Sequence, residues 1–378
     1  MNSLVSLSLT VLAVIFFAFA RKKFVFRIDS DESRMGGRTD LFLILIIILL
    51  TLFSGLRTGY NDTANYIVIF NASPKLSEFL ADSSNLHPLH NPLFYFITSL
   101  IRTLTPNYHV FLMLFAAATC TLMVTFLHKM TDREDFPLSL LLFLTLGTYI
   151  FTMAAIKQSF AMALLCPAVV ALRDRRYPKF FLLVAVAALV HTYAAVFFIL
   201  PLFASKPWRA RSFLLLAAAL FIMLNFESAL TSVLEYAGSI GKDIVDFEIF
   251  DGNRMNIFRV AVYSVVPVAS LVFRKRLEPE MGHTQEILIN MSICSVAFML
   301  PGMVSGANMF GRIAAYFELG TVCVMPWMIN TLFDKRSASL VKLLCALCFI
   351  AFALYDLSGF NEEYSKITLL TFIRELLG

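Results

Sequence analysis

The chain has 378 residues, of which 59% are hydrophobic and 15% are charged. An average soluble domain carries about 25% charged residues, so the composition excludes an ordinary soluble enzyme and indicates a polytopic membrane protein. Apolar runs long enough to cross a bilayer recur along the whole chain, and no long polar stretch is left for a soluble domain. The sequence therefore predicts a single all-α transmembrane domain over residues 1–378, with about 11–12 crossings.

The net charge of +5 does not predict a nucleic-acid partner, because the basic residues are gathered in short segments between apolar runs. An excess of Lys and Arg in such loops is typical of the cytoplasmic side of a membrane. The basic segments are residues 21–38, 173–179, 206–211 and 274–276. The acidic segment 227–256 is free to translocate and is predicted to be an extracytoplasmic loop.

In chain order, residues 3–20 form the first predicted crossing, with the N-terminus outside and the basic loop 21–40 in the cytoplasm. A second crossing at 41–55 returns the chain to the outside. The polar segment 57–90 is predicted to be a structured extracytoplasmic loop that lies along the membrane surface.

Further crossings are predicted at 108–127, 137–153 and 156–172, and the depth of residues 91–108 is left open. Beyond residue 211, a crossing at 212–226 and four more between residues 257 and 357 complete the set.

The run 180–204 has basic loops on both sides, although a single crossing would export one of them. Two short half-crossings that meet near residues 190–193 would keep both loops in the cytoplasm. Such a break is tolerated where it is buried in protein or lines a wet cavity, so His191 would lie at the bottom of an outward-facing cavity. A single long tilted helix with a buried, hydrogen-bonded His191 is the alternative.

The tail 360–378 is amphipathic and is predicted to lie on the outer membrane surface. Its apolar face consists of Ile367, Leu370, Ile373 and Leu377.

Polar side chains at membrane depth are costly and are therefore frequently functional. On the predicted topology Arg57 and Arg312 lie at the outer face, and Lys157 and His191 join them if the chain breaks near residue 190. Three cations around one outer cavity indicate a polyanionic ligand, and phosphate is the natural one. Arg57 and Arg312 also fit a simpler reading, in which each cation extends from a helix end to the interface.

His191 is the group whose ordinary imidazole pKa suits proton transfer near neutrality, although a lone histidine on an apolar face also fits a buried structural role. The sequence contains no metal-ligand spacing, no nucleotide-binding loop and no serine-nucleophile motif. Neither a metal nor an organic cofactor is therefore predicted.

Four groups of residues together carry a family resemblance. They are Gly55-Leu56-Arg57 with Asp62 and Tyr66, Ile156-Lys157-Gln158-Ser159-Phe160-Ala161, Ala188-Leu189-Val190-His191-Thr192, and Gly311-Arg312 with Tyr316-Phe317. In this order and spacing they resemble the Wzy/EpsG-type family of bacterial polysaccharide polymerases and chain-elongation proteins. The stretch 154–204 also resembles the corresponding part of GT-C glycosyltransferases, which implies a GT-C-like helical bundle with an outward-facing cavity.

The resemblance implies a polymerase that joins lipid-linked oligosaccharide repeats at the outer face of the bacterial cytoplasmic (inner) membrane. Donor and acceptor would both be carried on undecaprenyl diphosphate, within the membrane lipid, and a chain-length regulator could accompany the enzyme. His191 would deprotonate the acceptor hydroxyl, with Asp62 as the alternative base or as a sugar-orienting residue. The residues expected to bind the diphosphate and the substrate are Arg57, Lys157, Gln158, Arg312, Tyr316, Tyr66 and His90.

The chain departs from the family pattern at two places. Lys157 stands where the family usually has arginine, and lysine can hold phosphate but lacks the bidentate fork. His90-Asn91-Pro92 stands where an acidic residue often precedes the proline, which weakens the assignment of a carboxylate base there.

Other functions fit parts of the pattern. A GT-C-type transferase would add one sugar from a polyprenyl-phosphate donor, and Asp62 is the early carboxylate available to it. A flippase for lipid-linked oligosaccharides would need cations along a two-sided path. A membrane O-acyltransferase would use a histidine deep in the membrane, as His191 could be.

Overall fold

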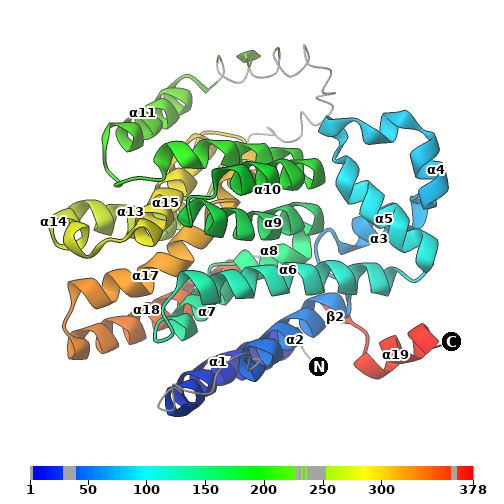
Figure 1. Cartoon of the computed structure of the whole chain (residues 1–378), viewed down its shortest axis with the longest axis horizontal. Helices are drawn as coiled ribbons and strands as arrows, with labels where there is room; N and C mark the ends of the chain where they lie inside the picture. The colour runs from blue at the N-terminus through cyan, green and yellow to red at the C-terminus, as the bar shows by residue number, and fades with distance from the viewer. Residues whose placement is uncertain are drawn as a thin grey trace. The chain divides into compact units, whose positions relative to one another are not determined.

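Helices make up nearly all of the secondary structure that the computed structural model contains (Figure 1). The residues described are 3–28, 40–226, 253–358 and 364–377, together with 228, 231, 232 and 235. Within them the one sheet is a pair of short strands. The protein is an all-α polytopic membrane protein, as its composition predicts. Most of the acidic segment 227–256 lies outside the described residues.

The chain divides into two units. Unit 1 consists of Met1–Ala171, Tyr177–Thr192 and Lys342–Gly378, and unit 2 consists of Leu172–Arg176 and Tyr193–Val341. The helices that lie wholly or mainly in unit 1 are α1 (Ser3–Ile28), α2 (Leu41–Gly55), α3 (Thr63–Ala72), α4 (Leu76–Ala81), α5 (Pro92–Leu104), α6 (Tyr108–Met130), α7 (Phe136–Thr145), α8 (Thr148–Ala154), α9 (Ile156–Arg173), α10 (Tyr177–Val190), α18 (Lys335–Ser358) and α19 (Leu369–Leu377), with the short 3-10 helices η1 (Ser83–Leu86) and η2 (Pro88–His90).

Helices α2 and α6 pack against each other in unit 1 and run in opposite directions (Figure 1). The Asp40 carboxylate caps the start of α2 by accepting a backbone hydrogen bond of 3.1 Å. The helix ends at Gly55, where an added Cβ would lie 2.6 Å from the Met113 sulfur and 3.1 Å from its Cα. Glycine therefore permits the close approach of the end of α2 to the first part of α6.

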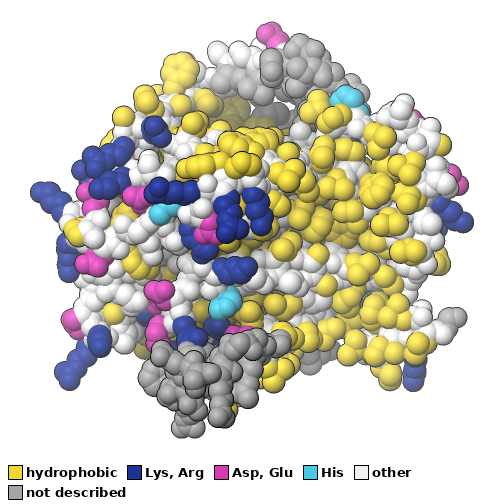
Figure 2. All heavy atoms as spheres, in the orientation of Figure 1, with side chains coloured by type: hydrophobic (Ala, Val, Ile, Leu, Met, Phe, Trp, Pro, Cys, Tyr) yellow, Lys and Arg dark blue, Asp and Glu magenta, His cyan; other side chains and the backbone are white. Residues whose placement is uncertain are grey.

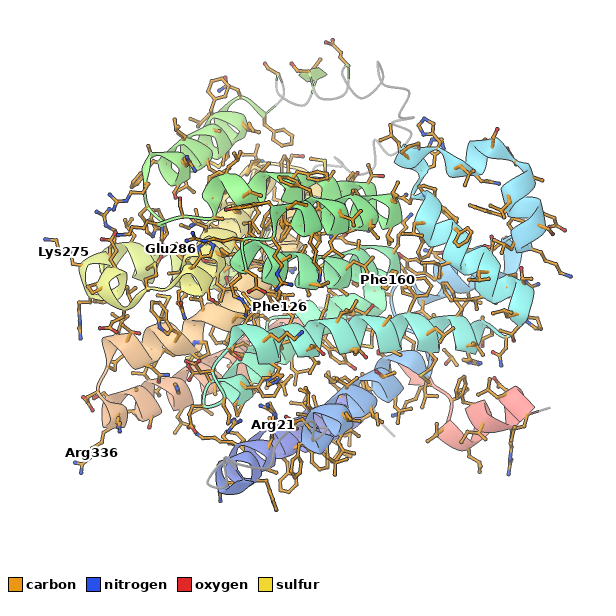
Figure 3. All side chains as sticks on the ribbon, viewed as in Figure 1. Arg21, Phe126, Phe160, Lys275, Glu286 and Arg336 are labelled. Atoms are coloured by element: carbon orange, nitrogen blue, oxygen red, sulfur yellow. The ribbon has the colours of Figure 1, made fainter. Side chains whose placement is uncertain are left out.

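The Asp40 end of α2 carries paired charges. The Arg21 guanidinium (Figure 3) hydrogen-bonds both Asp40 and His128, and His128 belongs to the last turn of α6. The same guanidinium lies over the ring of Phe136, the first residue of α7. The ion pairs at this end are Arg21–Asp40, Lys22–Glu134 and Lys342–Asp135. Residues 128–135, whose side the sequence does not resolve, therefore lie beside Arg21 and Lys22 of the basic segment.

The opposite end of α2 leads into strand β1 (Arg57–Gly59), which pairs antiparallel with strand β2 (Ser365–Lys366). This long-range pair is not predicted by the sequence. In α19, which follows β2, Phe372 is the buried side chain, while Leu370, Ile373 and Leu377 of the predicted apolar face are exposed. An exposed apolar face is what a helix on a membrane surface needs, and that placement stays a prediction.

Unit 1 also contains the chain breaks that the sequence predicts. Helix α8 ends at Ala154 and α9 begins at Ile156, so Lys157 lies in the first turn of a helix. Helix α10 ends at Val190 and the 3-10 helix η3 (Thr192–Phe203) begins two residues later, with His191 between them. The α-helix therefore ends within the predicted interruption at residues 190–193 and a 3-10 helix follows it, while the two half-crossings on either side stay a prediction.

Unit 2 is built around α15 (His283–Gly302). The helices α11, α13, α16 and α17 all pack against it, and its middle residues are buried. A Cβ on Gly320 would lie 2.5 Å from the Leu288 carbonyl oxygen, so glycine is needed where α17 meets α15. The other elements of unit 2 are η3, α11 (Ala210–Leu224), α13 (Ile257–Val272), α14 (Arg274–Leu277), η5 (Glu278–Glu280), α16 (Ala307–Ala315) and α17 (Leu319–Leu332).

In the described part of the chain, five helices are long and apolar enough to cross a membrane, or up to eight if each bent pair of helices is one span. Five shorter apolar helices accompany them, so the predicted 11–12 crossings require most of these to cross as well. One of the five shorter helices, α5, is hydrogen-bonded near both of its ends to segments at the Arg57 end of unit 1. Asn91, just before α5, accepts from Thr192, and Thr103, in its last turn, accepts from Leu76. Exposed apolar side chains cover much of the face in Figure 2, as lipid contact requires.

Candidate functional site

Arg57 is the buried cation of the candidate site. It follows the last turn of α2 and is 2% exposed. Its Nε donates a 3.0 Å hydrogen bond to Thr63 Oγ1, and its Nη1 donates to the carbonyl oxygen of Ser54. Thr63 Oγ1 donates onward to the carbonyl of Tyr60. The guanidinium is thus held in one orientation by the chain around it.

The groups that hold Arg57 are neutral. Burial lowers the pKa of Arg57 to about 10, because the charged form loses its water, and the neighbouring hydroxyls of Tyr364, Tyr149 and Tyr66 offset this only in part. The side chain remains charged at neutral pH. Among the residues that the structure describes, no carboxylate forms an ion pair with it. A buried cation with neutral partners leaves a site that an anion can neutralise.

Lys157 lies close to Tyr66, one of the tyrosines around Arg57. The backbone N–H of Lys157, in the first turn of α9, donates a 3.3 Å hydrogen bond to Tyr66 Oη. The Lys157 ammonium lies 5.7 Å from the Phe94 ring centroid and 5.5 Å from that of Tyr95, so two aromatic faces hold the charge in place. Tyr66 therefore links the surroundings of Arg57 to those of Lys157, and both predicted cations of unit 1 belong to one region.

Asn91 connects this region to His191. Asn91 adopts a left-handed conformation, with φ of 56°, immediately before α5. Its side-chain oxygen accepts hydrogen bonds from Thr192 N at 2.8 Å and from Thr192 Oγ1 at 3.0 Å. The chain break after α10 is thus fastened to the start of α5, whose first turn carries Phe94 and Tyr95. His191 itself is 8% exposed.

The C-terminal tail forms part of the Arg57 surroundings. The Tyr364 ring stacks on Phe53 with centroids 4.6 Å apart, and its hydroxyl donates to the Phe53 carbonyl. Lys366 is the strand partner of Arg57, and the backbone N–H of Ile367 donates 3.0 Å to the Leu56 carbonyl. These contacts secure the residues on both sides of Arg57. No local sequence pattern predicts these contacts, because the two strands are about 300 residues apart in the chain.

The other predicted residues of unit 1 take different positions. Asp62 is half-buried at the start of α3 and accepts from Asn65 Nδ2, so it is not the partner of Arg57. Gln158 is buried beside Lys157, whereas His90 is exposed, with its ring 4.6 Å from that of His87.

Arg312 and Tyr316 belong to unit 2. Arg312 is exposed on α16, and Tyr316 is buried directly after that helix. Their predicted share in the site stays a prediction.

The chemistry of the region in unit 1 is cationic. Arg57 and Lys157 supply two positive charges, and three helices begin near them. Helix α3 begins at Thr63, which bonds Arg57. The first turn of α5 carries Phe94, which contacts Lys157, and Lys157 itself is in the first turn of α9. Helix N-termini carry partial positive charge, so they favour an anion here. Within residues 3–28, 40–226, 253–358 and 364–377, no group of three His, Cys, Asp or Glu side chains could hold a metal ion.

The fold and this region define a multi-pass helical membrane protein with a buried cationic site. Neither a curated protein nor a solved structure matches the chain. The sequence model of the EpsG family matches residues 40–371, which is most of the chain and includes every predicted site residue. The protein belongs to the EpsG family, which indicates a glycosyltransferase-like polysaccharide-polymerase type of function.

Proposed function

We propose that the protein polymerises oligosaccharide repeats carried on undecaprenyl diphosphate, at the outer face of the bacterial cytoplasmic membrane. The observation that carries the proposal is the buried Arg57, which is charged, rigidly held and bonded to neutral groups. Lys157, linked to it through Tyr66, adds a second cation. A diphosphate is the anion that such a pair of cations suits.

The two ends of α2 support the outer position. The Asp40 end pairs with Arg21, which belongs to the basic segment 21–38, and such segments stay in the cytoplasm. Arg57 lies at the other end, about 22 Å away for a helix of 15 residues. A single crossing by α2 therefore puts the cationic region on the outer side.

The reaction is a glycosyl transfer. The acceptor hydroxyl forms a bond to the anomeric carbon of the donor glycan, and the bond from that carbon to the diphosphate breaks. Undecaprenyl diphosphate departs with the electron pair, and the hydroxyl proton passes to a base on the enzyme. Arg57 and Lys157 stabilise the charge that develops on the departing diphosphate, with Arg312, Tyr316, Gln158, Tyr66 and His90 as further binding residues.

His191 is the proposed base. Its backbone lies at the break between α10 and η3, fixed through Thr192 to Asn91 at the start of α5. An imidazole is suited to accept a proton near neutral pH. Asp62, half-buried at the start of α3, is the alternative base or orients a sugar hydroxyl.

The test compares the polysaccharide made by a strain that lacks the protein and carries wild-type or variant chains at equal membrane levels. Wild type should give a ladder of repeats on a glycan gel. Arg57→Ala should remove the ladder, while Arg336→Ala, which removes an equal charge from an exposed position, should retain it. A full ladder from Arg57→Ala would contradict the proposal. A single added sugar, in place of a ladder, would identify a GT-C-type transferase instead.

The same strain separates the remaining alternatives. Repeats that fail to reach the outer surface without the protein would indicate a flippase. To assign the base, His191→Ala and Asp62→Ala are compared: the variant at the base should lose the ladder at every pH, and the other should keep a shortened one.

A further inference from the structure

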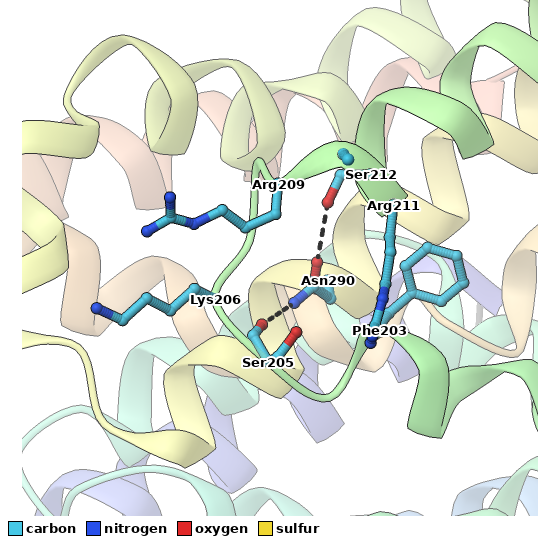
Figure 4. Close-up of a pocket in the computed structure, with 8 residues that line it drawn as sticks. Phe203, Ser205, Lys206, Arg209, Arg211, Ser212 and Asn290 are labelled. Atoms are coloured by element: carbon cyan, nitrogen blue, oxygen red, sulfur yellow. Dashed lines mark hydrogen bonds between the residues drawn. The ribbon is translucent and has the colours of Figure 1, made fainter.

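Unit 2 contains a cavity that the function proposed above does not use (Figure 4). Its volume is about 270 Å³, and it lies between the end of η3, the start of α11 and the first half of α15. Three of its eight lining residues are basic, and none of the eight is a carboxylate. The lining consists of Phe203, Ser205, Lys206, Arg209, Ala210, Arg211, Ser212 and Asn290.

The floor of the cavity is polar and fixed. Asn290 and Ser212 are each 2% exposed. Asn290 Nδ2 donates to the Ser205 carbonyl at 2.7 Å and to the Glu286 carbonyl at 2.9 Å, while Ser212 Oγ lies 3.5 Å from Asn290 Oδ1. These bonds hold the segment from Phe203 to Ala210 in a turn across α15, so the cavity does not depend on a mobile side chain.

Two cations stand at its mouth. Lys206 and Arg209 extend side by side in the same direction from this turn (Figure 4), and in the described part of the chain neither forms an ion pair. Arg211 Nη1 instead donates 2.7 Å to the Leu202 carbonyl and closes the other side. A parallel ammonium and guanidinium suit a phosphate group.

The surroundings of the cavity are apolar. Leu202, Phe213 and Leu214 flank the turn and are exposed. The carbonyl of Trp208, in the same turn, accepts 3.5 Å from Arg274 Nη1, which brings two of the predicted cytoplasmic basic segments together. A ligand here meets cations at its head and exposed apolar side chains alongside, at the level where a cytoplasmic loop meets the membrane.

We propose that this cavity binds the phosphate headgroup of an anionic membrane phospholipid on the cytoplasmic side, with Lys206 and Arg209 as the headgroup ligands. The cavity shares no residue with the Arg57 region, since all of its lining belongs to unit 2. It does not rest on the polymerase activity.

The test measures lipid binding by native mass spectrometry of the full chain, released from detergent with phosphatidylglycerol or phosphatidylcholine at equal concentration. Wild type should retain phosphatidylglycerol preferentially. Because each basic residue near anionic lipid contributes about 1 kcal/mol, Lys206→Gln with Arg209→Gln should weaken its retention about 30-fold. The matched control is Lys335→Gln with Arg336→Gln, which removes the same two charges from the exposed first turn of α18 (Figure 3) and should change retention little.

Four outcomes overturn the proposal. They are equal retention of the two lipids by wild type, unchanged retention by the Lys206/Arg209 variant, an equal loss in the control, and saturation of the site by inorganic phosphate at the same concentration. The last would identify a free anion as the ligand. The wild-type comparison of two lipids does not depend on the folding of any variant. The single variant Arg209→Lys, which keeps both charges, should retain most of the binding that the double variant loses.

Discussion

Arginine is buried at both ends of α2, and the two residues are equally hidden, at 2% exposure each. At the Asp40 end Arg21 lies 2.5 Å from the Asp40 carboxylate, which also caps the helix. At the other end Arg57 bonds a hydroxyl and a carbonyl. The first charge is neutralised by the fold, and the second is not.

The difference is the reason that we propose a functional role for Arg57 and a structural one for Arg21. Removing one partner of a buried ion pair leaves an uncompensated charge and destabilises a protein strongly. A buried arginine with neutral partners opposes folding through its lost hydration, so an apolar residue of similar length can replace it at little loss of stability. Burial alone therefore does not distinguish the two roles, but the presence or absence of a carboxylate does.

The largest expected effect comes from exchanging each arginine for methionine. Arg57→Met should lower polymer formation about 10²–10³-fold, as for loss of one donor to a developing anion, with little change in thermal stability. Arg21→Met should do the reverse, because it leaves Asp40 without its partner: a lower melting temperature with activity per folded molecule retained. The measurements are glycan gels and melting curves in detergent. Equal destabilisation by both changes would remove the distinction.

Shortening the tail should give the next largest effect. A chain that ends at residue 363 lacks Tyr364 and β2, and we expect about a thirtyfold loss of activity because Arg57 is no longer held in place. A chain that ends at residue 368 loses α19 but keeps the strand pair, so it serves as the matched control and should stay near wild type. If the two truncations behave alike, the strand does not position Arg57.

Lys157 should show a smaller effect. Lys157→Met removes the second cation and should reduce activity about tenfold, equivalent to roughly 1.4 kcal/mol. Lys157→Arg should restore the activity, because a guanidinium can also stack on the rings of Phe94 and Tyr95 and adds a bidentate fork. An arginine variant that is as inactive as the methionine variant would show that the role of Lys157 is not its charge.

The smallest expected effect is on stability. The folded-state pKa of Arg57, about 10, is below its ordinary value, so burial of the charge opposes folding at neutral pH, and this penalty declines only as the pH rises above about 10. A bound diphosphate should offset this penalty. Inorganic pyrophosphate should therefore raise the melting temperature of wild type by about 2–4 °C between pH 7 and 9. A similar rise in Arg57→Met would place the anion elsewhere.

The general class of fold could be predicted because hydropathy and charge are local properties of the sequence. The breaks at Ala155 and His191 were also within reach, since a polar residue inside an apolar run and an excess of basic loops both indicate an interruption. The depth of residues 128–135 was not, because it depends on side-chain pairs such as Lys342–Asp135, which are far apart in sequence.

For the candidate site, the motifs identified Arg57, Tyr66 and Lys157 but not the groups that orient them. Arg57 and Asp62 belong to one motif, but in the structure Arg57 bonds Thr63, and Asp62 is half-buried at the start of α3. Tyr364 and Asn91 hold the site through long-range hydrogen bonds. A single sequence does not reveal such contacts, because neither residue belongs to a charged or periodic pattern.

The Thr58 hydroxyl donates a hydrogen bond to the Ser365 hydroxyl, 307 residues further along the chain. This separation determines when the contact can form during biosynthesis. At about 5–20 residues per second, a ribosome needs roughly 15–60 s to make the intervening chain. During that interval α2 is already available for insertion while the segment that will flank Arg57 has not been translated. The buried cation is therefore completed late, after most helices have entered the bilayer, and a nascent chain cannot assemble the full surroundings of Arg57 before then.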